Sequence, residues 1–195
     1  MPWRSDEAFV YGLDFFTDVV ARVPDSGWGR PSPCTGWRAI DVLGHVGSAV
    51  RFGTALLRGE SPEWEPVDPP GSAVHADPGA WWYALVEPAR QAVQGADLSR
   101  MVDSPLGRRS IGEGLGFPAV DLFVHAWDLG RSVGSDVDIP AHAVEFAHAV
   151  IDPIPDEQKR SPRVFAKAVP PPADATASQS FLAWTGRDPA WTPAS

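Results

Sequence analysis

The segment 117–134, FPAVDLFVHAWDLGRSVG, carries three ionisable side chains within an otherwise apolar stretch. Asp121, His125 and Asp128 are spaced i, i+4 and i+7, so a helix would present all three on one stripe. A buried carboxylate needs a partner, a proton or a metal, because unpaired burial is costly. The Asp121–His125 pair suits zinc or another first-row divalent cation, and a metal-free hydrogen bond between the two is the alternative.

A candidate third ligand lies far upstream, in the segment 32–46, SPCTGWRAIDVLGHV. His45 stands among apolar residues there, and a packed core histidine is the simpler alternative. Asp41, four residues earlier, is expected either to orient the His45 imidazole or to point to solvent. Together with Asp121 and His125, His45 completes a set of three. Three protein ligands with one open position are typical of a catalytic metal site.

Five neighbouring side chains have less specific interpretations. Asp128 is expected to have a structural role, for example by accepting hydrogen bonds from loop amides, rather than to act as a fourth ligand. Arg131, one turn further on, is expected to pair with Asp128 or with an acidic ligand. Trp37 and Trp127 flank the proposed ligands and are candidate pocket walls, although core packing explains them equally well. Cys34 has no histidine beside it in the sequence, so we do not expect a nucleophile there.

The elements that must position these residues are predicted to be helices. Apolar residues recur at helical spacing in five segments, 6–23, 37–58, 79–94, 117–133 and 140–152. The Pro-rich and acidic segment 59–78 predicts a long loop, and 102–116, with Pro105 and four glycines, predicts a loop or a short hairpin. Beyond these, 163–169 could form a short strand and 174–186 a last short helix. The pattern predicts an all-α helical bundle over 1–155, with 156–195 as a short extension packed on it.

Composition narrows the classes of partner. The chain has 195 residues, of which 44% are hydrophobic and 21% charged, and this is an ordinary globular composition. A net charge of −9 argues against nucleic acid or an anionic membrane as a partner. The single cysteine excludes an intramolecular disulfide. No stretch is apolar enough to span a bilayer and MPWRSDEAF lacks a secretory core, so we expect a cytoplasmic protein.

Three segments together carry a family resemblance. SPCTGWRAIDVLGHV resembles the early motif of the DinB-like metal-binding superfamily, and more closely the branch of the mycothiol-dependent maleylpyruvate isomerase N-terminal domain. VDLFVHAWDLGRSVG is similar to the later signature of that branch. FLAWTGRDPAW is similar to the C-terminal tail of many short actinobacterial members. The resemblance therefore extends over most of the chain.

The resemblance implies a DinB-like four-helix bundle, here with an extra helix and a short C-terminal α/β-like tail. Its His–acid–His ligand triad falls on His45, Asp121 and His125, which would hold a divalent metal between helices. The isomerase has Glu at the position of Asp121, which bears on the identity of the metal. Zinc is expected, with nickel, iron and manganese as alternatives. The isomerase also has a sizeable C-terminal domain, whereas here only the segment 156–195 follows the bundle.

The function implied is that of a metalloenzyme with mycothiol as cosubstrate. A free thiol has a pKa near 8.5, and a divalent cation that coordinates it favours the thiolate. Such an enzyme would transfer the thiol to a small electrophilic substrate or isomerise that substrate. A metal-dependent hydrolase without thiol and a non-catalytic metal-binding or stress protein are the alternatives. A homodimer is left open.

Overall fold

The computed structural model describes residues 3–60, 67–103, 107–160 and 164–193. Long helices dominate the described part of the chain: α1 (Ser5–Val20), α2 (Ala39–Leu57), α3 (Pro78–Val93), α4 (Ile111–Ser132) and α5 (Ala141–Ile151). Shorter elements connect or follow them: the 3-10 turns η1 (Asp25–Gly27) and η2 (Pro70–Ala73), the strands β1 (Met101–Val102) and β2 (Arg109–Ser110), and the helices α6 (Asp156–Lys159) and α7 (Ala177–Trp184). No helix in these ranges is long and apolar enough to cross a membrane.

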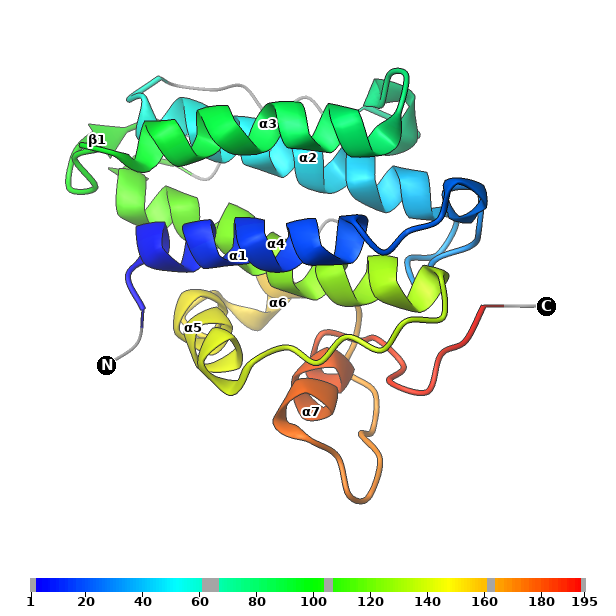
Figure 1. Ribbon diagram of the computed structural model, residues 1–195. Coiled ribbons are helices and arrows are strands. Elements are labelled where there is room, and N and C mark those ends of the chain that lie inside the picture. The colour runs from blue at the N-terminus through cyan, green and yellow to red at the C-terminus, as the bar shows by residue number, and fades with distance from the viewer. Residues whose placement is uncertain (1–2, 61–66, 104–106, 161–163, 194–195) are drawn as a thin grey trace.

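Helices α1 to α4 form a four-helix bundle (Figure 1). Helix α4 packs along both α1 and α2, and α3 covers the other side of α2. Helix α5 lies against α4, and α7 packs on α5 on the side away from α2 and α3 (Figure 1). Large side chains such as Phe9, Leu43, Trp82 and Phe123 are fully buried between the helices. The predicted all-α bundle with an additional helix is therefore confirmed, and four of the five long helices begin and end within one turn of their predicted limits.

Helix α4 is the exception, because it begins at Ile111 rather than near Phe117. A loop or a short hairpin was predicted before it, and β1 and β2 form a short antiparallel pair there, while residues 104–106 lie outside the described ranges. Ser110 and Glu113 then form a capping box, in which the Glu113 carboxylate accepts the Ser110 N–H at 2.8 Å. Gly107 is a loop glycine with a φ of +92°, but two further glycines of this stretch serve helix packing instead. An added Cβ at Gly114 would lie 3.0 Å from Leu56, and one at Gly116 would lie 3.1 Å from Val150.

The C-terminal extension differs from its prediction in one respect. The strand expected over 163–169 is absent from residues 164–169, which pair with no neighbouring strand in the described structure. The N–H of Val169 donates instead to the carbonyl of Ala183, near the end of α7, at 3.0 Å. Three consecutive prolines, 170–172, follow and have no N–H to offer to a sheet. The predicted last helix forms as α7, which is capped by Thr176.

Two glycines of helix α2, Gly44 and Gly47, allow it to pack closely against η2 and α3. A Cβ at Gly44 would overlap the carbonyl group of Pro70 in η2, and one at Gly47 would overlap the indole ring of Trp81 on α3. The carboxylate of Asp41 reinforces the first contact by accepting the N–H of Gly71 at 2.9 Å. These contacts fix the position of α2, and with it that of His45.

We expect Gly44→Ala to lower the free energy of unfolding by about 1–3 kcal/mol, because the backbone of η2 would have to move away from α2. Urea denaturation measures the change. Gly112→Ala in the first turn of α4 is the matched control, since its Cβ meets only ordinary contacts of 3.4 Å or more. That control should leave stability unchanged or raise it by up to about 1 kcal/mol through helix propensity. Equal losses in the two variants would contradict the close-packing explanation.

Candidate metal centre

The three predicted ligands converge between α2 and α4. One ligand atom from each of His45, Asp121 and His125 lies within 4.8 Å of the other two. His45 Nε2 is 3.5 Å from Asp121 Oδ2, and the imidazole centroids of His45 and His125 are 4.7 Å apart. The four-residue spacing on α4 puts Asp121 and His125 on the same face, opposite His45 on α2.

This donor set fits a divalent cation. Two ligands at about 2.0–2.1 Å from one tetrahedral ion lie roughly 3.3 Å from each other, which is close to the observed His45–Asp121 separation. The side chains of His45 and Asp121 are 24% and 34% exposed, whereas that of His125 is buried. The cluster is therefore reached from solvent on one side, where an exogenous ligand could approach.

The protonation states of the cluster also suit metal ligation. Burial lowers the pKa of His125, and the opposing effect of Asp128 does not offset it, so this imidazole is neutral at neutral pH. For Asp121, partial burial favours the protonated acid, but its hydrogen bond with His45 and the charge of Arg187 help to bring its pKa below the usual value. Metal ligands must be a neutral imidazole and an ionised carboxylate, and the cluster provides both.

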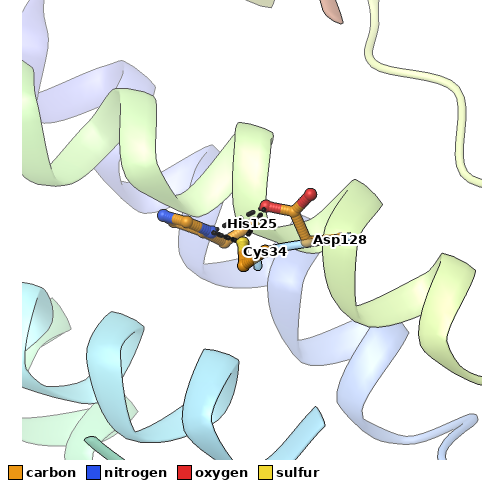
Figure 2. Close-up of side chains that lie close together, drawn as sticks. All are labelled: Cys34, His125 and Asp128. Atoms are coloured by element: carbon orange, nitrogen blue, oxygen red, sulfur yellow. Dashed lines mark hydrogen bonds and ion pairs between the residues drawn. The ribbon is translucent and has the colours of Figure 1, made fainter. Parts of the chain in front are cut away.

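Asp128, one turn after His125, supports the cluster from within the core. Its side chain is completely buried, and Oδ2 lies 2.8 Å from His125 Nδ1 (Figure 2). The other ring nitrogen, Nε2, points away from this carboxylate (Figure 2). A carboxylate on one ring nitrogen fixes the tautomer of a histidine and leaves the second nitrogen to bind a metal. Asp128 accordingly bonds an imidazole and not the loop amides that we expected.

The charge of Asp128 is balanced by Arg187, which follows α7. Arg187 Nε donates to Oδ1 at 2.9 Å, and Nη2 donates to Oδ2 at 2.7 Å. Burial opposes ionisation of Asp128, but the Arg187 charge and the hydrogen bonds from His125 and Arg187 hold the pKa of this carboxyl well below its usual range. The same ion pair raises the pKa of Arg187.

Cys34 is closer to this network than its sequence neighbours indicated. Its Sγ lies 4.0 Å from His125 Nδ1 and donates to Asp128 Oδ2 at 3.3 Å (Figure 2). Burial and the charge of Asp128 raise the pKa of the Cys34 thiol well above its usual value. Cys34 is therefore a neutral hydrogen-bond donor at neutral pH, which agrees with the expectation that it is not a nucleophile.

Two charged residues have partners other than those predicted. Both oxygens of Asp41 accept backbone N–H groups, from Arg38 at 2.8 Å and from Gly71 at 2.9 Å, so Asp41 caps α2 and anchors η2. Arg131 pairs with Asp136 at 2.9 Å and donates to the carbonyl of Trp191 at 3.0 Å. The predicted pairing of Arg131 with Asp128 is wrong, because Arg187 occupies that position.

The two candidate pocket tryptophans differ. The Trp37 ring centroid lies 5.1 Å from that of His45 and 6.2 Å from that of His125, so Trp37 lines one side of the cluster. Trp127 is buried in the bundle core with the guanidinium of Arg131 5.8 Å from its ring. Core packing is therefore the better interpretation of Trp127.

The helical bundle and its His–Asp–His cluster define a DinB-like protein. Residues 11–130 match the family model of the Mycothiol maleylpyruvate isomerase N-terminal domain. The chain belongs to this family, which confirms the branch suggested by its motifs.

The relatives of the chain are consistent with this family. An uncharacterized protein of Mycobacterium tuberculosis, found in two strains, is 31% identical over 179 residues, which cover 89% of this chain and 92% of the relative. The crystal structure of the mycothiol-dependent maleylpyruvate isomerase is similar with a TM-score of 0.62, and that of a histidine-to-alanine mutant with 0.61, each at 16% identity. Each match covers 73% of this chain and 65% of the solved chain. Because the identity is only 16%, this likeness establishes the shared fold alone.

We expect Asp128→Asn to lower the free energy of unfolding at pH 7 by about 3–5 kcal/mol, because Arg187 would remain buried without its counter-charge. The folded pKa of Asp128 lies below its unfolded value, so its stabilising effect is complete above about pH 4 and falls as the pH drops further. Denaturation of both proteins at pH 7 and below pH 4 should show the difference shrinking in acid. A difference that stayed constant with pH would argue against an ionised Asp128.

Proposed function

We propose that this chain is a divalent-metal-dependent enzyme that uses a low-molecular-weight thiol, mycothiol, to modify or isomerise a small electrophile. The observation that carries the proposal is the convergence of His45, Asp121 and His125 at a point open to solvent on one side. Membership of the family supports the thiol, because its solved relative is a mycothiol-dependent isomerase. Zinc is the proposed metal, since two imidazoles and one carboxylate are a common zinc ligand set.

The residues of the cluster would have distinct tasks. His45, Asp121 and His125 would hold the cation, which when bound lowers the pKa of a coordinating thiol and makes it nucleophilic at neutral pH. Asp121 supplies the one negative charge of the ligand set, and Trp37 limits water access beside the two imidazoles. Cys34 stays protonated and does not compete with the external thiol.

Two outcomes follow from attack of a thiolate on an electrophilic carbon–carbon double bond. If the new C–S bond persists and the adjacent carbanion takes up a proton, the product is a thiol adduct. If rotation about the former double bond precedes loss of the thiolate, the double bond re-forms with the opposite geometry and the thiol is regenerated. The first outcome is thiol transfer and the second is cis–trans isomerisation.

We expect His45→Ala and His125→Ala each to remove most of the metal from protein purified without an affinity tag. Each substitution deletes one of three ligands, while the apolar core of α2 and α4 is left in place, so circular dichroism should remain largely helical. His75→Ala, in the segment between η2 and α3, is the matched control and should retain the metal. Elemental analysis measures the content and identifies the metal. Unchanged content in both ligand variants would refute the proposed ligand set.

The thiol is tested with cobalt-substituted protein, in which a coordinated thiolate gives a charge-transfer band. We expect mycothiol to produce this band in the native chain and not in His45→Ala. Conjugation of the test electrophile monochlorobimane should also require both metal and mycothiol. Hydrolysis of electrophilic esters without thiol, in the absence of the band, would instead indicate a metal hydrolase. A protein that binds metal but shows neither behaviour would be a non-catalytic metal-binding protein.

A further inference from the structure

Arg187 connects the C-terminal extension to the interior of the bundle. It lies 59 residues after Asp128, and its side chain is mostly buried. Its guanidinium donates hydrogen bonds to both oxygens of the Asp128 carboxylate. Such a two-point contact fixes the plane of a carboxylate as well as its charge. Oδ2, which accepts from Nη2 of Arg187, is also the atom that faces His125 Nδ1.

The backbone conformation around Arg187 directs this side chain toward Asp128. Gly186 has a φ of +88°, and a Cβ there would lie 2.7 Å from the Cβ of Ala166 and 2.9 Å from its carbonyl carbon. Glycine therefore turns the chain sharply after α7. The N–H of Arg187 then donates to the carbonyl of Leu182 at 3.0 Å, and its Nη1 lies 3.3 Å from Thr185 Oγ1.

We propose that Arg187 is a positioning residue of the metal centre, which fixes the Asp128 carboxylate so that Asp128 in turn orients the His125 imidazole toward His45 and Asp121. This inference rests on the metal site proposed above. It assigns to the C-terminal extension a part in the site, although no residue of the extension belongs to the ligand set. The alternative is an ion pair that contributes to folding and has no influence on His125.

Metal affinity separates the two interpretations. Arg187→Met should weaken zinc binding by about 10- to 100-fold, the usual effect of losing a residue that supports a ligand, when measured by chelator competition at a temperature where the variant is folded. Arg187→Lys keeps the charge but loses the planar fork, so its affinity should lie between those of the native chain and Arg187→Met. Arg160→Met is the matched control. Arg160 lies within the extension and donates to two of its own carbonyls, those of Ala166 and Trp184, so its loss should leave affinity unchanged.

A double-mutant cycle tests whether Arg187 acts through Asp128. The variant with both Arg187→Met and Asp128→Asn removes the buried charges together, so it should fold even if Arg187→Met alone does not. We expect it to bind zinc no more weakly than Asp128→Asn, because the two residues form one unit. Additive losses of affinity would overturn the proposed relay.

Nitrogen-15 NMR of the metal-free protein gives a readout that does not depend on the metal. We expect His125 to carry its proton on Nδ1 in the native chain and in Arg160→Met, and to populate a mixture of tautomers in Arg187→Met and to a smaller extent in Arg187→Lys. A folded Arg187 variant with native zinc affinity and a native His125 spectrum would overturn the inference. If the native chain bound no metal, the proposed function would fail, and the His125 spectra would still decide whether Arg187 positions this ring.

Discussion

The buried carboxylate of Asp128 is the constraint on which the arrangement of the site depends. A charge with no exposed surface must be compensated by partners that are themselves held in place. Three partners meet it here: the imidazole of His125 on the same helix, the guanidinium of Arg187 from the extension, and the thiol of Cys34 from the segment before α2. One side chain thereby ties together three parts of the chain that are remote in sequence.

Close helix packing is the second requirement, because His45 reaches Asp121 only if α2 and α4 lie near each other. Glycines on both helices allow this approach. A Cβ at Gly53 of α2 would lie 3.2 Å from Leu115, and one at Gly114 of α4 would lie 3.0 Å from Leu56. An aspartate is one methylene shorter than the glutamate expected from the family resemblance, so a closely packed helix pair suits the acid that this chain carries at position 121.

The sequence was informative wherever one helix carried the signal. Periodicity predicts the long helices, and the i, i+4 spacing places Asp121 and His125 on one face, where His45 was proposed to complete a set of three ligands. Contacts between segments that are remote in the sequence cannot be predicted from residue spacing. Spacing therefore does not identify Arg187, although it lies in the motif FLAWTGRDPAW, and the sequence neighbours of Cys34 do not reveal its contacts with His125 and Asp128. The available signal was Asp128 itself, since an acid in so apolar a helix requires a cation from elsewhere in the chain.

The same reasoning explains why Asp41 and Arg131 have other partners than expected. At the first turn of α2, Asp41 meets unpaired backbone N–H groups, which an aspartate caps more readily than it reaches a side chain one turn further on. Arg131 lies near the C-terminal end of α4, where the chain beyond α7 passes and presents the carbonyl of Trp191. With Arg131 holding the end of the extension and Arg187 holding Asp128, the short segment after α7 is fixed at two points on α4. The segment after α7 in this way supports the buried His125 imidazole, through Asp128, from outside the four-helix bundle.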